Sequence, residues 1–234
     1  MSTLWKDTKY SRSFGLSEKI KEQENHGLRN TGRNTAGNSS KLLTRISLTA
    51  LFAALTAAGT FFAIPVGPVP IVLQNLFALL SGLILGPVMG GAAVGLYLLA
   101  GVLGFPVFAG GTGGIARFAG PTGGFLIGYF LAAVTAGFIA GRPGGKANRV
   151  VQEPAGFPNR SNTPLPRLIA AVIAGLLVVY VPGVVWLKIR GNLDWIKALL
   201  AGFIPFIAGD AVKGIAAVII APRLRRIAAD LIHE

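Results

Sequence analysis

Long stretches of this chain contain no charged residue. The first covers residues 46–116, the second 118–141 and the third 168–187. A helix needs about 20 predominantly apolar residues to cross the hydrocarbon core of a bilayer, so the first stretch alone has room for about three crossings. The pattern predicts a polytopic α-helical membrane protein rather than a soluble domain.

Gly and Pro residues divide these stretches into shorter apolar segments, because both residues readily end helices. Two of the segments are short for a full crossing, which indicates tilt or helix ends buried in protein. The fold class we expect is an all-α membrane protein with a bundle of six transmembrane helices. They are predicted at about residues 46–64, 71–85, 90–103, 125–140, 168–187 and 199–221.

Polar segments surround the apolar ones. Residues 1–44 are rich in Ser, Asn, Gly, Lys and Glu and are expected to be a disordered extension. The membrane domain then covers 45–226, with a polar loop insert at 141–167 and a short tail at 227–234.

Lys and Arg residues predict the orientation. Most of them lie before the first expected helix, in the loop 141–167, or after the last helix at Arg223, Arg225 and Arg226. With six crossings these regions share one side of the membrane, and loops rich in Lys and Arg are cytoplasmic. Both termini are therefore expected in the cytoplasm, in a multi-pass protein of the plasma membrane. The other side holds only Arg117, Lys188, Arg190 and Lys197.

Composition agrees with a membrane protein. Hydrophobic residues make up 52% of the chain, charged residues 13%, and the mean hydropathy is +0.61. The net charge of +13 is explained by the cytoplasmic loops and by contact with anionic lipids. We expect no nucleic-acid partner, because no basic helix with interleaved aromatics is present. Cysteine is absent, which excludes disulfides, zinc–thiolate sites and iron–sulfur clusters, and no metal or cofactor is expected.

Asp210 and Lys213 are the most informative residues, because they lie within an otherwise apolar segment. Their spacing of three places both on one helix face. A charged side chain near the bilayer centre costs roughly 2.5–3.5 kcal/mol, so such residues usually mark a site or a pathway. The alternative is an ion pair that only stabilises helix packing. We favour a binding site.

Other polar residues are weaker candidates. Gln74 and Asn75 follow a Pro-rich turn, where they can bind a ligand, cap a helix or lie among the lipid headgroups. Arg117 is the lone charge of the Gly-rich connection 107–124. Its planar guanidinium can bind an anionic group, or it can be an interfacial arginine whose charge reaches water.

The first expected helix carries Ala50, Ala54 and Ala58 at intervals of four residues. Small side chains on one stripe let another helix approach closely. Packing within the bundle and packing against a partner protein are equally compatible with this pattern.

Four motifs follow one another along the chain: Gly-Pro-Val-Pro-Ile-x-Leu-Gln from Gly67, Gly-x-Pro-Val-Phe from Gly104, Gly-Pro-Thr-Gly-Gly from Gly120 and Gly-Asp-x-x-Lys from Gly209. In this order they resemble those of the BioY family, the biotin-specific S components of energy-coupling-factor (ECF) vitamin transporters. Some members have an asparagine near the second motif, where this chain has Ala109 followed by two glycines.

The resemblance implies a six-helix fold whose substrate pocket is capped by the first and third connecting loops. It implies biotin contacts by Asp210 and Lys213, with Arg117, Asn75 and Gln74 as further candidates. It also implies that the alanine stripe packs against a transmembrane coupling subunit, which carries two ATPase subunits. This chain itself has no nucleotide-binding motif.

Biotin has a ureido group, an apolar ring and a carboxylate tail, so Asp210 can accept the N–H groups, while Lys213 or Arg117 can bind an oxygen. Aromatic side chains such as Phe108, Phe118 and Trp186 suit the ring. Other hypotheses stay open: a solitary carrier, active alone or as a homo-oligomer, an S component for another vitamin, and, remotely, an intramembrane enzyme that uses Asp210. We expect no enzyme and no catalytic residues, because both histidines lie in the polar termini.

Overall fold

The computed structural model describes residues 39–64, 69–141 and 163–233, and these are mostly helical. The chain divides into two compact units, Met1–Leu43 and Thr44–Glu234, and everything described below about packing concerns the second. Most of the expected extension 1–44 and of the loop insert 141–167 lies outside the described residues. Among the described residues, the first helical residue is Ser39, within the expected extension, and the last is His233, within the expected tail.

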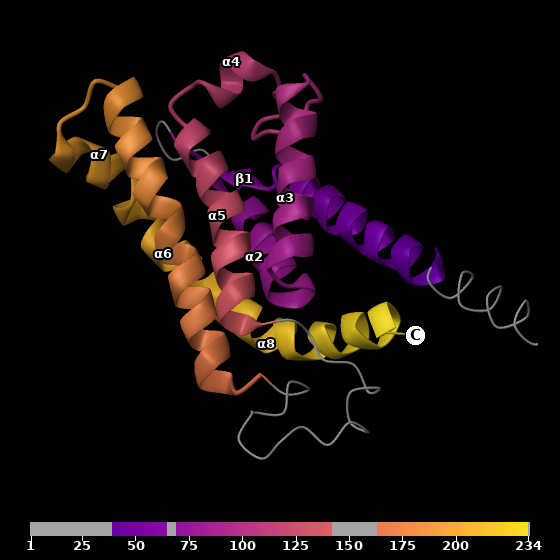
Figure 1. Ribbon diagram of the computed structural model, residues 1–234. Helices are drawn as coiled ribbons and strands as arrows, with labels where there is room; N and C mark the ends of the chain where they lie inside the picture. Colours follow the sequence, from indigo (N-terminus) through magenta and orange to yellow (C-terminus); the bar gives the residue numbers. More distant parts are fainter. Residues whose placement is uncertain (1–38, 65–68, 142–162, 234) are drawn as a thin grey trace, which may run out of the picture. The chain divides into compact units, whose positions relative to one another are not determined.

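Figure 1 shows the order of the elements along the chain. The first helix, Ser39–Ala58, is followed by two short strands, β1 (Ala63–Ile64) and β2 (Ile71–Val72). The other elements are α2 (Gln74–Leu85), α3 (Pro87–Val102), α4 (Ile115–Phe118), α5 (Gly123–Ala140), α6 (Leu165–Arg190), α7 (Trp195–Gly202), the 3-10 helix η2 (Ile204–Phe206) and α8 (Ile207–His233).

Length and composition allow a membrane crossing by four helical segments of the described residues. The two segments expected to be short, now α2 and α3, are indeed shorter apolar helices. The turn between them uses Gly86, whose φ of 83° suits a residue without a side chain, and Pro87 begins the next helix. The four longer segments are Ser39–Ala58, Gly123–Ala140, Leu165–Arg190 and Trp195–Ile232.

The first helix differs from its expected range of 46–64. It ends at Ala58, and β1 then pairs with β2 in antiparallel register, with Ala63 opposite Val72. At the end of the helix a Cβ on Gly59 would lie 2.9 Å from the Cα of Gln74, so the chain passes tightly against the start of α2. The strand pair replaces both the last turn of the expected first helix and the first residues of the expected second helix.

The expected helix 199–221 is two helices. α7 ends at Gly202, the backbone of Phe203 leaves the helical region at φ −131°, and η2 leads into α8. Pro205 lies within η2 and contributes no backbone N–H donor, which favours an interruption here. This break decides where the functional side chains lie, because it places Asp210 in the first turn of α8.

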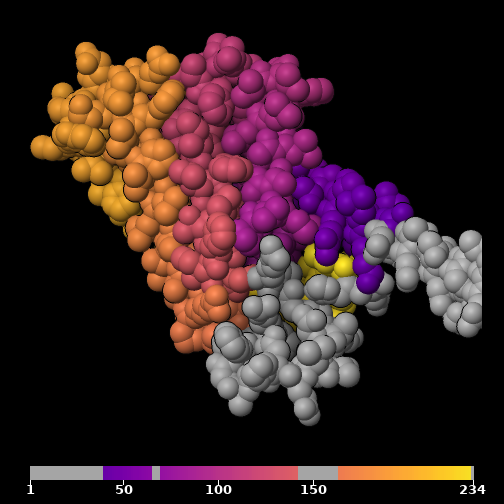
Figure 2. Space-filling view, in the orientation of Figure 1, coloured from indigo at the N-terminus to yellow at the C-terminus, as the bar shows by residue number. Residues whose placement is uncertain are grey.

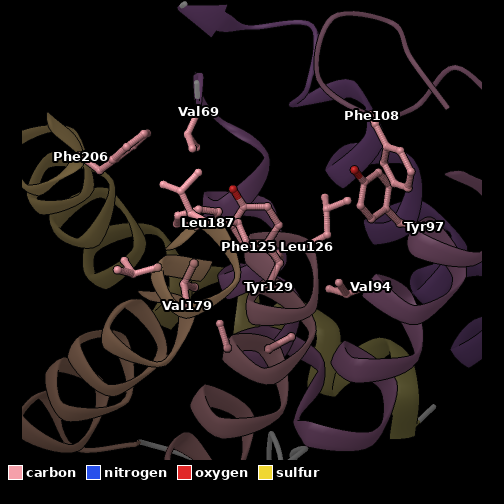
Figure 3. Packing of buried hydrophobic residues seen from close by; sticks show 14 of the residues in the cluster. Val69, Val94, Tyr97, Phe108, Phe125, Leu126, Tyr129, Val179, Leu187 and Phe206 are labelled. Atoms are coloured by element: carbon pink, nitrogen blue, oxygen red, sulfur yellow. The ribbon is translucent and has the colours of Figure 1, made fainter. Parts of the chain in front are cut away.

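Helix α5 lies at the centre of the packing and contacts α6, α2 and α3, while α8 packs against α2 and α6. Glycines allow the close approach of α5 to α6, since a Cβ on Gly124 would lie 2.4 Å from the carbonyl oxygen of Pro182. Figure 3 shows part of the core, where the rings of Tyr97 and Phe108 meet edge to face and Phe125 and Tyr129 extend from α5.

The outer face of α6 is apolar. Ile169, Ile173, Leu177 and Val181 are exposed at intervals of four residues and form one stripe along the helix. Figure 2 shows the surface of α6 beside that of α5. In water such a stripe would be costly, whereas lipid tails solvate it, so the outward side chains support a membrane protein.

Candidate binding site

Three helices bring four polar side chains together. Asn75 Nδ2, from α2, donates to Asp210 Oδ1 at 2.9 Å. Lys213 Nζ donates to the same carboxylate oxygen at 3.0 Å and to Asn75 Oδ1 at 2.9 Å. Tyr180, from α6, donates its hydroxyl to the other carboxylate oxygen, Oδ2. We call these four residues the polar cluster.

Local backbone structure explains how the polar cluster forms. Strand β2 leads directly into α2, which places Asn75 in the first turn of that helix. The break before α8 likewise places Asp210 in the first turn of α8. The unpaired N–H groups at a helix N-terminus favour a carboxylate there. Lys213 follows one turn later and reaches the same carboxylate.

Three members of the polar cluster are buried, and the fourth, Tyr180, is partly buried. Asp210 and Lys213 are each 6% exposed and Asn75 is 8% exposed. Opposite charges cancel within the pair, and the amide of Asn75 bonds both members, which offsets part of the cost of removing them from water. Asn75 does not cap α2, since the N-cap residue is Leu73 and no side chain bonds at that cap.

A cavity adjoins the polar cluster. It comprises about 270 Å³ of space and is partly open to the surroundings, and all four polar side chains line it. Its other walls come from the segment before α2 and from α5, α6 and η2: Val69, Pro70, Val72, Phe125, Tyr129, Val179 and Phe206. Such a cavity, mostly apolar with a few converging polar groups, is typical of a small-molecule site.

A second cavity of about 350 Å³ lies beside the first. The two share the wall formed by Val69, Pro70, Val72, Phe125 and Tyr129. The second one is lined in addition by Gln74, Phe108, Ala109, Arg117, Thr122 and Leu126. Polar side chains therefore line both cavities, which share one apolar wall apart from the hydroxyl of Tyr129.

The predicted site residues thus separate into two groups. Asp210, Lys213 and Asn75 form one hydrogen-bonded cluster, whereas Gln74 and Arg117 line the second cavity. Gln74 is fully buried, whereas Arg117 is exposed.

Of the three aromatic residues suggested for the ring of a ligand, only Phe108 lines a cavity described here. Trp186 instead donates its indole N–H to the carbonyl oxygen of Gly120 at 2.9 Å and so ties α6 to the connection before α5. Phe118 packs against the hydrophobic core.

The sequence did not single out Tyr180 or Tyr129 as ligand-binding residues. Both line the first cavity, and Tyr180 also bonds Asp210. The signal available was a tyrosine inside a charge-free helix, whose hydroxyl needs a partner when buried. Within the described residues, no group of three or more His, Cys, Asp or Glu side chains could hold a metal ion.

The alanine stripe lies on the outer surface. Ala50, Ala54 and Ala58 are exposed, while Ala53 and Thr56 on the opposite side of the helix are buried. Within the described residues the stripe therefore does not pack inside the bundle. Its small side chains remain accessible to another helix.

Comparisons with known proteins indicate the family of the chain. The family model for the BioY family matches residues 30–230. A protein of Pyrococcus horikoshii named probable biotin transporter BioY is 41% identical over 180 residues, which cover 77% of this chain and 95% of that protein. The biotin transporter BioY of Thermotoga maritima is 36% identical over 177 residues, 76% of this chain and 93% of that protein.

A solved structure is similar as well. The crystal structure of the S-component for biotin from an ECF-type ABC transporter matches with a TM-score of 0.65 and 32% identity, covering 80% of this chain and 93% of that one. The motifs, the polar cluster and these comparisons lead to one conclusion: the chain belongs to the BioY family.

Proposed function

We propose that this chain takes up biotin as the substrate-binding S component of an ECF-type transporter, and that it has no enzymatic activity. The observation that carries the proposal is the buried polar cluster beside an apolar cavity. Similarity to proteins named biotin transporter BioY, and to a biotin S-component, supports the choice of ligand.

The first cavity suits the ureido ring of biotin. Asp210 offers a carboxylate to an N–H group, and Lys213 keeps one N–H donor beyond the two bonds described. Phe125, Tyr129 and Phe206 provide apolar walls for the fused ring. The ureido group of biotin therefore contacts the charged side chains, and its fused ring contacts the apolar walls.

The second cavity suits the carboxylate tail. Lys213 is already neutralised by Asp210, so the first cavity carries no net charge. Arg117 has no carboxylate partner among the described residues, and it lines the second cavity with Gln74 and Thr122. We therefore assign the anionic end of biotin to Arg117 and the ureido end to the polar cluster.

The partners in this proposal are a transmembrane coupling subunit and two ATPase subunits, together with membrane lipids. Six helices cross the plasma membrane, both termini and the loop insert are cytoplasmic, and the exposed stripe of Ala50, Ala54 and Ala58 packs against the coupling subunit. A stripe of small residues supports such close helix packing in lipid.

Calorimetric titration of the detergent-purified protein with biotin, desthiobiotin, lipoate and thiamine tests the ligand. Biotin should bind most tightly, and desthiobiotin more weakly because it lacks the sulfur-containing ring. Lipoate and thiamine should not bind. A protein that binds thiamine or lipoate in preference to biotin, or no vitamin at all, contradicts the proposal.

Uptake of radiolabelled biotin with and without the coupling and ATPase subunits tests the transport role. Uptake should need all subunits, and Ala54→Leu should reduce it while biotin binding by the purified protein is unchanged. Val181→Leu, on the exposed stripe of α6, is the matched control and should leave uptake unchanged. Full uptake without the other subunits would instead indicate a solitary carrier, acting alone or as a homo-oligomer.

A further inference from the structure

The two oxygens of the Asp210 carboxylate differ in how many hydrogen bonds they already accept. Oδ1 accepts two, from Asn75 and from Lys213. Oδ2 accepts one in the described part of the chain, from the hydroxyl of Tyr180. Since each carboxylate oxygen has about two acceptor positions, Oδ1 is filled and Oδ2 keeps one position open.

The ring of Tyr180 is held in place by the fold rather than by a ligand. It packs edge to face against Phe203, with ring centroids 4.7 Å apart and planes at 89°. Phe203 lies at the break between α7 and η2, where the backbone leaves the helical region. The break that places Asp210 at the start of α8 thus also fixes the side chain that bonds it.

The hydroxyl of Tyr180 affects both geometry and charge. It prevents rotation of the carboxylate, because each oxygen is tied to a different helix. It also withdraws negative charge from Oδ2, as a donor to a carboxylate does. The Tyr180 hydroxyl and the Lys213 ammonium group together leave the Asp210 carboxylate able to accept one further N–H donor, which suits a neutral group.

We propose that Tyr180 is a positioning residue that makes the Asp210 site selective for a neutral cyclic urea over a cyclic guanidinium. The inference rests on the proposed function, since it names the part of that site that discriminates between ligands. A urea edge presents one N–H beside a carbonyl oxygen, which matches a single open acceptor. A guanidinium edge presents two parallel N–H donors, which need two open acceptors and gain from a fully charged carboxylate.

Tyr180→Phe tests this with two ligands, biotin and its guanidinium analogue 2-iminobiotin, titrated at neutral pH. Without the hydroxyl the carboxylate of Asp210 can rotate away from its binding geometry, so we expect biotin affinity to fall about tenfold or more. Affinity for 2-iminobiotin should stay the same or rise, so the ratio of the two affinities should shift by at least about tenfold. Tyr97→Phe is the matched control: it makes the same change at a buried tyrosine that lines neither cavity and should leave the ratio unchanged.

An unchanged ratio of the two affinities would overturn the inference. If both affinities fall equally, Tyr180 only supports the structure; if neither falls, it does not affect the site. If wild-type protein binds biotin while the ratio is unchanged in Tyr180→Phe, only the inference fails. If wild-type protein does not bind biotin, the proposed function fails with it.

A second measurement needs no ligand. Infrared difference spectra of the ligand-free protein, with Asp210→Asn used to identify the Asp210 band, should show a shifted carboxylate stretch in Tyr180→Phe and none in Tyr97→Phe. Phe203→Leu, which removes the ring that holds Tyr180, should shift the same band by a smaller amount. A carboxylate band that is identical in wild type and Tyr180→Phe contradicts the proposal even if the variant has lost biotin binding.

Discussion

Lys213 and Arg225 are both cations of α8 and both are 6% exposed, but their partners differ in kind. Lys213 bonds the side chains of Asp210 and Asn75, next to a cavity. Arg225 bonds backbone carbonyls: it donates to the oxygen of Leu83, to that of Ala140 at 3.1 Å and to that of Gly141 at 2.9 Å.

The difference follows from where each side chain meets the other helices. Leu83 lies in the last turn of α2, and Ala140 and Gly141 lie at the C-terminal end of α5. The last carbonyls of a helix have no partner within it, and a guanidinium can donate to several of them at once. Arg225 thus provides donors to carbonyl groups at the ends of two helices.

Burial of a charge therefore does not by itself identify a binding site. The partners of Lys213 are side chains, which can turn toward a ligand and exchange one hydrogen bond for another. The partners of Arg225 are backbone groups fixed by their helices. We expect substitutions of Lys213 and its partners to change ligand affinity, and substitutions of Arg225 to change stability.

The largest effect is expected at the polar cluster. Asp210→Asn and Lys213→Ala should each reduce biotin affinity well over tenfold in a folded protein, because each removes a group assigned to the ureido ring. Each also leaves the remaining charge buried without its partner, which costs about 3–5 kcal/mol of stability. Calorimetric titration and thermal unfolding in detergent measure the two effects.

The double variant Asp210→Asn/Lys213→Met separates the effect on biotin affinity from the effect on stability. With both charges removed, thermal stability should recover toward the wild-type value while biotin binding remains lost. Unchanged biotin affinity in either single variant would remove that residue from the site and would make the pair a purely structural one.

The next effect is expected at Arg225. Arg225→Met leaves the carbonyls of Leu83, Ala140 and Gly141 without this donor, and should lower the free energy of unfolding by about 2–4 kcal/mol. Biotin affinity should stay within about twofold, since no ligand contact is lost. Thermal unfolding with and without biotin checks both.

Arg223→Met is the matched control, because Arg223 lies on the exposed side of the same helix segment. Its effect on stability should be within about 0.5 kcal/mol. Loss of biotin affinity in Arg225→Met with unchanged stability would break the distinction between the two cations.

Sequence patterns predicted more of the polar cluster than of its surroundings. The i, i+3 spacing of Asp210 and Lys213 in an apolar segment predicted that both lie on one helix face, and in the structure they form an ion pair at 3.0 Å. Asn75 was only one of several weak candidates, because bonds between α2 and α8 depend on how helices distant in sequence pack. Tyr180 was missed as a partner of Asp210 for the same reason.

The break at Phe203 and the role of Arg225 could not be predicted. An apolar run with one proline at Pro205 is compatible with a kinked helix or with two helices, and packing decides between them. Arg225 belongs to a basic cluster that the sequence explains by orientation in the membrane. Only the packing of α8 shows that Arg225 is buried while Arg223 and Arg226 are exposed.

A smaller effect is expected at Arg117, a cation that lines a cavity but is partly open to solvent. Arg117→Gln should weaken biotin binding by about fivefold, because a pair of charges near a surface contributes about 1 kcal/mol. Affinity for the uncharged amide of biotin should stay the same. Titration with both ligands at low and high salt measures this, and an equal loss for both would exclude Arg117 as the partner of the carboxylate.

The smallest effect is expected at Asp194, an exposed charge whose partners include a backbone group. It caps α7 by accepting the backbone N–H of Lys197 at 2.8 Å, and this bond lowers the pKa of the Asp194 carboxyl below its ordinary value. A lowered pKa means that the folded state favours the carboxylate. The stability gained from this charge is therefore complete above about pH 4 and is lost as the pH falls through the folded-state pKa.

Asp194→Asn keeps a capping side chain that does not titrate. The difference in melting temperature between wild type and Asp194→Asn should therefore be small and constant from neutral pH to about pH 5, and should shrink below about pH 4. Biotin affinity at neutral pH should be the same in both, as expected for a charge far from the cavities. A difference that does not change with pH would show that the negative charge of Asp194 contributes nothing to the cap, and altered biotin binding would contradict the link between the type of partner and function.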